Sequence, residues 1–159
     1  MGKFDDVNVS SLINDLSNIL DDVNTRKHRL DFINESITSN IWSSESRNNF
    51  ERGIISLKNK LGELEPILQN YLGIAGKIEQ YKDIEFETEA KQMEYNSIET
   101  SREVCLVSYD DEGNPHTEWV WQEDPNEVAR KNRLMNEIEL NNIKMDRIYD
   151  DIFYSVYTR

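Results

Sequence analysis

The residues best suited to chemistry are few and lie far apart in the sequence. The histidines are His28 and His116, and the single cysteine is Cys105. A zinc site or a nucleophilic site needs several such groups close together. His28 stands among basic residues and is expected to be solvated, whereas Cys105 has no base near it in the sequence and is expected to pack inside a hairpin. The sequence therefore predicts no catalytic residue and no metal site.

A cluster of acidic residues around a glycine, Asp110–Asn114, is the remaining candidate for an ion site. The twelve-residue spacing of a calcium-binding EF-hand is absent, so the cluster favours a turn. The many carboxylates between Glu79 and Glu99 are typical of a solvated helix face. No glycine-rich phosphate loop is present either. We therefore expect no cofactor and no enzyme activity. A metal or cofactor bound to the purified protein would favour an enzyme instead.

The composition favours slender helices over a deep globular core. Of the 159 residues, 37% are hydrophobic and 31% are charged, and the net charge is −13. A chain with so little apolar material gains from a second chain that helps to bury its helix faces. The negative charge disfavours nucleic acid and anionic membrane surfaces as partners. The apolar runs are far shorter than the roughly 20 residues that a membrane-spanning helix needs, so no stable membrane insertion is expected.

Apolar residues at steps of three and four predict a first helix over residues 10–40, with a serine or asparagine from Asn8–Ser11 as its cap. A second helix is expected from Ser43 or Ser44 towards Thr100, and Pro66 is expected to bend it without breaking it. Its apolar positions alternate steps of four and three, the pattern of a left-handed helix–helix seam. This seam comprises Phe50, Ile54, Leu57, Leu61, Leu64, Leu68, Tyr71, Ala75 and Ile78. We expect Leu57, Leu61, Leu64 and Leu68 to form a partner interface, although the same seam also serves packing on the first helix.

After the second helix, the composition of the chain changes from helix-forming to strand-forming residues. Residues 104–121 are rich in β-branched and aromatic side chains around a turn-forming stretch, which predicts a small β-hairpin. Asp124 as cap and Pro125 at the first helical position predict a third helix that reaches almost to Arg159. The expected fold is mainly all-α, an antiparallel helical hairpin extended by a β-hairpin and a third long helix. The expected domains are residues 1–100 and 101–159.

The link between the first two helices carries a resemblance. A helix-forming segment of about 40 residues leads to Trp42, and Phe50 opens the leucine-seamed helix eight residues later. This arrangement resembles the WxG-motif (Esx-like) proteins of bacterial type VII secretion, although Ser44 stands where that family has glycine. The resemblance implies a helical hairpin that pairs into a four-helix bundle, as a homodimer or with a related protein. The alternative is that Trp42 is an ordinary aromatic residue that fills the end of a hairpin.

The resemblance also implies an export signal of the form Tyr-x-x-x-Asp/Glu after the second helix. Tyr81 and Glu85 fit this form, and Tyr95 and Glu99 fit it further along the chain. Spacing of four residues places both side chains on one helix face. We expect Tyr81 and Glu85 on the exposed side of the helix, with the Tyr81 ring at most partly buried and its hydroxyl in water. Such pairs also arise by chance on a solvated acidic helix. Short stretches at Glu79–Phe86 and Arg130–Met135 are similar to longer Esx-type secreted proteins of Gram-positive bacteria.

These expectations combine into two functional hypotheses. The first is a non-enzymatic secreted protein or substrate-pairing partner of a type VII system, whose partners are itself or a related small helical protein and the secretion ATPase. Residues 1–11 contain no basic region followed by an apolar stretch, so export without a cleaved signal peptide, from the cytoplasm, is expected. The alternative is a cytosolic adaptor or immunity protein that binds a toxin through its acidic surface.

Overall fold

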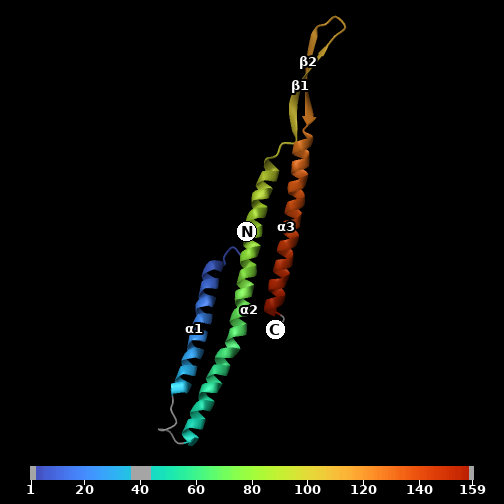
Figure 1. The fold of residues 1–159 in the computed structure, drawn as a ribbon. Helices are drawn as coiled ribbons and strands as arrows, with labels where there is room; N and C mark the ends of the chain where they lie inside the picture. The colour runs from blue at the N-terminus through green and yellow to red at the C-terminus, as the bar shows by residue number, and fades with distance from the viewer. Residues whose placement is uncertain (1–2, 37–43, 158–159) are drawn as a thin grey trace. The chain divides into compact units, whose positions relative to one another are not determined.

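The computed structural model describes residues 3–36 and 44–157, and its elements follow one another as three helices and a two-stranded ribbon (Figure 1). The elements are α1 (Val9–Ser36), α2 (Ser44–Ser97), β1 (Ser101–Tyr109), β2 (Pro115–Glu123) and α3 (Pro125–Tyr157). The predicted fold class, mainly helical with a small antiparallel β-hairpin, is confirmed.

Side-chain caps determine where α1 and α3 begin. The Asn8 side chain accepts a hydrogen bond from the Ser11 backbone amide at 3.1 Å, and this satisfies one of the amides that a helix start leaves unpaired. Asp124 does the same for α3 by accepting from the Asn126 amide at 3.0 Å, with Pro125 in the first helical position. Both caps were predicted from the sequence. The predicted extension of the first helix to residue 40 lies outside the described residues.

The helix α2 is continuous over 54 residues and would measure about 80 Å at 1.5 Å per residue. Pro66 lies inside it without ending it, as predicted. The helix ends at Ser97, three residues before the predicted end.

The ribbon formed by β1 and β2 is antiparallel and in continuous register from Ser101 opposite Glu123 to Tyr109 opposite Pro115. Its turn is organised by Asp110, whose carboxylate accepts hydrogen bonds from the backbone amides of Glu112 and Asn114 at 2.9 and 2.8 Å. Gly113 adopts a φ of 84°, a conformation that glycine takes without steric cost. The strands extend the predicted hairpin by a few residues at its open end.

The residues form two compact units, which are described separately. One unit comprises the residues up to Gln80 together with those from Ile152 onwards, and the other comprises Tyr81–Asp151. The units therefore divide within α2, whereas the sequence-based division at residue 100 lies at the junction of α2 and β1. The apolar side chains of the first unit that are buried are Val9, Val23, Ile54, Ile74, Ala75, Ile78 and Ile152.

In the second unit, the C-terminal part of α2 pairs with α3 in antiparallel fashion. Arg130 bonds Glu94 at 2.6 Å, and Lys91 bonds both Glu87 and Glu137 at 2.7 Å. The polar residues Thr88 of α2 and Asn141 of α3 are also buried in this unit. The Asn141 amide nitrogen has no hydrogen bond of ordinary length among the described residues, although Asn141 contributes to the lowered pKa of Glu87, whose main cause is Lys91.

Candidate functional site

The apolar seam of α2 divides into two rows that differ in exposure. Every seventh residue from Ile54 onwards forms an inner row, which is buried or half-buried: Ile54, Leu61, Leu68 and Ala75. The alternate positions are Phe50, Leu57, Leu64, Tyr71 and Ile78. Phe50 is half-buried and Ile78 is buried, whereas the middle three are exposed and form an outer row, Leu57, Leu64 and Tyr71. In the outer row, Leu57 is 52% exposed and Leu64 is 44% exposed. Between Leu57 and Tyr71, the inner row therefore packs more closely within the chain than the outer row does.

The helix α1 repeats the same division. Its inner row, also spaced by seven residues, is Val9, Leu16, Val23 and Leu30, all buried or half-buried. Its outer row is Leu12, Ile19 and Ile33, all exposed, with Arg26 at the position between Ile19 and Ile33. Both helices of the pair therefore carry an apolar row that the described residues leave partly exposed.

The two outer rows lie on one face of the α1–α2 pair. Two ion pairs, Lys27 with Glu65 at 2.6 Å and Lys58 with Asp31, cross between the antiparallel helices. Lys27, Lys58 and Glu65 occupy the positions directly after an outer-row position, so they lie on the flank opposite the outer rows. We name the six apolar residues of the outer rows the hairpin face: Leu12, Ile19, Ile33, Leu57, Leu64 and Tyr71.

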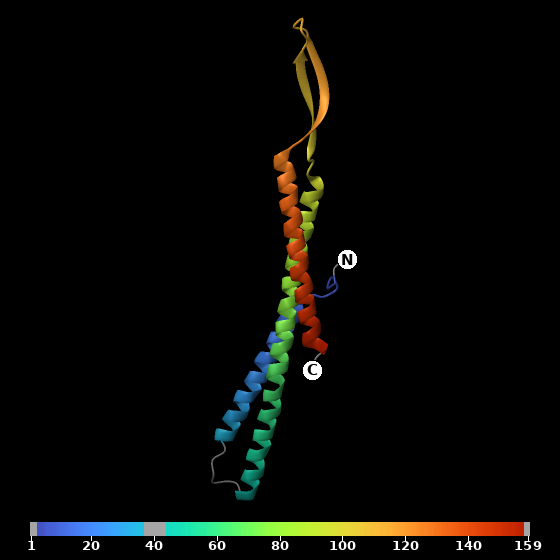
Figure 2. The same cartoon turned by 90° about the vertical axis from the view of Figure 1, so that its right-hand side faces the viewer.

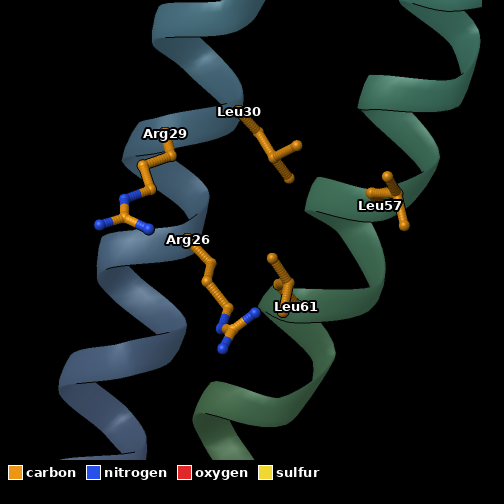
Figure 3. A pocket seen from close by; sticks show the side chains of 5 residues that line it. All are labelled: Arg26, Arg29, Leu30, Leu57 and Leu61. Carbon is orange, nitrogen blue, oxygen red and sulfur yellow. The ribbon is translucent and has the colours of Figure 1, made fainter.

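An open groove of about 330 Å³ lies between the two helices on this face (Figure 3). The figure shows Leu30 and Leu61 directed towards the space between the helices, with Leu57 beside them and Arg26 reaching towards Leu61. Arg26 is held by Asp22 at 2.7 Å, and Arg29 completes the lining. The groove can accept an apolar side chain from another molecule next to the Arg26 guanidinium group.

The four leucines predicted as a partner interface fall into two groups, two in the outer row and two in the inner row. Leu57 and Leu64 belong to the hairpin face and are exposed. Leu61 and Leu68 belong to the inner row and are half-buried. A partner interface at all four stays a prediction, but Leu57 and Leu64 are the members that a second molecule reaches first.

The predicted exposure of Tyr81 is wrong. Its side chain is only 5% exposed, and Glu85 is half-buried. Burial raises the pKa of the Tyr81 hydroxyl, and the nearby Glu85, Asp146 and Tyr149 raise it further. The physical reason is that α2 turns this position towards α3, from which Asp146 and Tyr149 act on the tyrosine.

The alternative pair, Tyr95 and Glu99, does not share a helix face. The helix α2 ends at Ser97, so Glu99 lies beyond it. Tyr95 is half-buried, with the Lys131 ammonium group 4.8 Å from its ring centroid. Neither tyrosine–glutamate pair is a fully exposed helical pair in this chain.

The turn motif is described only in part. Trp42 lies outside the described residues. Ser44 is the first residue of α2 and is exposed, and Phe50 is half-buried. A serine at a helix start is compatible with a capping role in place of the family's glycine.

A second apolar surface lies on the ribbon, and the sequence analysis did not identify it. Residues directly opposite in an antiparallel ladder point to the same side. The register therefore places Cys105, Val107, Tyr109, Trp119 and Trp121 on one side, which we name the ribbon face. Trp119 is 64% exposed and Trp121 is 72% exposed. The period-two alternation of these residues in both strands was the available signal.

The ribbon face has no cover within its own unit. Figures 1 and 2 show both strands projecting beyond the adjoining ends of α2 and α3, and no helix segment of Tyr81–Asp151 lies over either side of the ribbon. An isolated two-stranded ribbon is marginally stable in water unless it packs on something. Such a ribbon gains stability from a partner.

Chemistry at the other candidate positions is limited. Within residues 3–36 and 44–157, no three His, Cys, Asp or Glu side chains are placed so that they could hold a metal ion. The Asp110 carboxylate is engaged by its own turn, and the hydrogen bonds from Asn114 and its neighbours lower its pKa. Cys105 is half-buried opposite Trp119. None of the described helices is long and apolar enough to span a membrane.

Compared with known proteins, the chain matches no family model, no curated protein and no solved structure.

Proposed function

We propose that this chain is a non-enzymatic helical pairing protein, a secreted substrate or substrate-pairing partner of a bacterial type VII (Esx-like) secretion system. The hairpin face pairs with a second copy or with a related small helical protein, and the resulting bundle is presented to the secretion ATPase. The observation that carries this proposal is the division of both seams into a covered inner row and an exposed outer row.

Three features support pairing at this face. The positions of its outer rows recur every seven residues on both helices, the spacing at which one helix packs against another, and they are apolar except for Arg26 on α1. Residues 1–80 contain nine basic and twelve acidic side chains, so this part of the chain is nearly balanced and two copies repel only weakly. The groove at Arg26 also offers a place for an apolar side chain of the partner.

The pairing test compares the two rows of α2. Leu57→Ser combined with Leu64→Ser removes outer-row leucines and should convert a dimer into a monomer with its helicity unchanged. The matched control is Leu61→Ser combined with Leu68→Ser, which should lower the melting temperature because these leucines pack on α1. Sedimentation velocity and circular dichroism measure both effects. If the outer-row variant kept the sedimentation mass of the wild type, pairing through the hairpin face would be excluded.

The secretion test compares culture supernatant with cell lysate in strains with and without the secretion ATPase. We expect the protein in the supernatant only when the ATPase is present. Export at the wild-type level without the ATPase would contradict the type VII assignment and leave the pairing result untouched.

A test of Tyr81 and Glu85 in export requires substitutions that preserve the packing of the buried tyrosine ring. Glu85→Gln keeps the size of the side chain and removes its charge, and Tyr81→Phe keeps the buried ring and removes the hydroxyl. Loss of secretion in both, with unchanged helicity, is the result expected of an export signal. Secretion of both variants at the wild-type level would exclude this pair.

A second candidate function is a cytosolic adaptor or immunity protein that binds a toxin. The distribution of charge favours it, because residues 81–159 contain nine basic and nineteen acidic side chains, a net charge of −10. Retention of the protein in the lysate in both strains is the outcome expected of this alternative.

A further inference from the structure

The ribbon face is large enough to be an interaction surface. With about 150–250 Å² for each fully exposed aromatic side chain, its residues leave on the order of 500 Å² of surface in solvent. Single domains rarely leave a larger contiguous apolar patch bare, and patches of this size are often functional. The ribbon face is therefore a candidate binding surface, and the charge around it limits the chemistry of the partner that can bind.

Acidic groups surround the exposed rings. Residues 101–124 contain one arginine, no lysine and seven acidic residues, a net charge of −6. A second copy of the ribbon would bring two such segments together, and their like charges would repel. An anionic membrane surface is disfavoured for the same reason. A cationic partner is the one whose charge complements this segment.

The register places two carboxylates beside one of the tryptophans. Glu103 is directly opposite Trp121, and Glu123 follows Trp121 by two positions on the same strand. Side chains at these positions share the side of the ribbon that carries Trp121. A lysine or arginine side chain over the Trp121 ring would gain a cation–π contact and two carboxylate neighbours. This end of the ribbon face fits a cationic side chain.

The other end of the ribbon face is apolar. Trp119 is opposite Cys105, and Val107 and Tyr109 continue the same side towards the turn. The Trp119 and Trp121 positions are two residues apart, about 7 Å along the strand, which is also the spacing of alternate side chains in any extended segment. An extended segment can therefore place a cationic side chain at one tryptophan and an aliphatic side chain at the next.

We propose that the ribbon face is a docking surface for an extended, basic segment of another protein, in which lysine or arginine is spaced with aliphatic residues. The cationic side chain occupies the Trp121–Glu103–Glu123 end, and the aliphatic side chains cover Trp119, Val107 and Tyr109. This surface is separate from the hairpin face, and its test does not depend on secretion or on pairing.

The test uses the full chain and a short capped lysine–valine peptide, titrated by isothermal calorimetry. Lysine and valine take turns at every second position of this peptide, with serine between them, so that both side chains face the same side of the extended peptide. We expect Glu103→Gln combined with Glu123→Gln to weaken binding of this peptide by about ten-fold. The matched control is Glu118→Gln, which removes the same charge from the same strand but from the opposite side of the ribbon. It should change the affinity by less than about two-fold.

Three outcomes would overturn the proposal. The first is an equal loss of affinity in the Glu118→Gln control, which would indicate attraction by charge alone. The second is equally tight binding of a peptide in which glutamate replaces lysine. The third is conversion of a dimer into a monomer by Trp119→Ser combined with Trp121→Ser, which would assign the ribbon face to a second copy. The glutamine variants keep the size of the side chains, so the ribbon fold is not at risk.

Discussion

At the scale of the residue, Tyr81 shows how the packing of a neighbouring helix determines whether a side chain is buried or exposed. The apolar seam that begins at Phe50 reaches Ile78, and its next two positions fall on Lys82 and Glu85. This fading of the seam predicted an exposed tyrosine. The helix instead continues with a second set of inward positions that includes Tyr81 and Thr88, both buried. The tyrosine ring is therefore part of the core.

The burial of Tyr81 has consequences for stability and for its pH dependence. Tyr81→Ala should lower the free energy of unfolding by about 3–5 kcal/mol, as expected for truncation of a buried aromatic residue. Because the pKa of Tyr81 is raised in the folded state, its hydroxyl contributes stability below about pH 10, and this contribution is lost as the pH rises further. The free-energy difference between wild type and Tyr81→Phe should therefore decrease above pH 10 in urea denaturation. A constant difference would contradict the burial.

At the scale of the element, local rules predicted the helices and the ribbon well. Asn8, Asp124 and Pro125 mark helix starts through backbone chemistry that depends only on neighbouring residues. The division of each seam into inner and outer rows was not predictable in this way. A repeat of four and three treats Leu57 and Leu61 alike, and only the position of α1 separates them. The exposure of Trp119 and Trp121 likewise depends on what lies over the ribbon.

The interior proline of α2 gives a prediction for this element. Pro66 removes one backbone hydrogen bond, and its side chain is exposed, so it contributes little packing in return. Pro66→Ala should raise the free energy of unfolding by about 1–3 kcal/mol, measured by urea denaturation. The matched control is Pro125→Ala at the first position of α3, where proline costs no hydrogen bond and the change should be close to zero. Equal effects of both substitutions would contradict this account of Pro66.

At the scale of the whole molecule, the charge is distributed unevenly along the sequence. The chain carries a net charge of −13, and residues 81–159 account for −10 of it. Pairing through the hairpin face brings two negatively charged chains together, whereas docking at the ribbon face joins opposite charges. Higher ionic strength should therefore increase the affinity of pairing and decrease the affinity of docking at the ribbon face.

Salt dependence separates the two interactions in one set of measurements. Raising the salt concentration from about 0.05 to 0.5 M should strengthen self-association in sedimentation experiments, because screening weakens the repulsion between copies. The same change should weaken binding of the lysine–valine peptide. If both interactions changed in the same direction, at least one of the two surfaces would be assigned incorrectly.

The two ends of the ribbon meet at its base, so residues 101–123 form an insertion between α2 and α3 that can be deleted or exchanged. The Asp124 amide donates a hydrogen bond to the Thr100 carbonyl at 2.8 Å, so the chain leaves α2 and returns to α3 at almost the same point. Replacement of residues 101–123 by a short loop should therefore leave both helix ends in place. Ribbons of other lengths and sequences could be grafted at this point, and evolution could exchange a recognition sequence here without redesigning the helices that carry it.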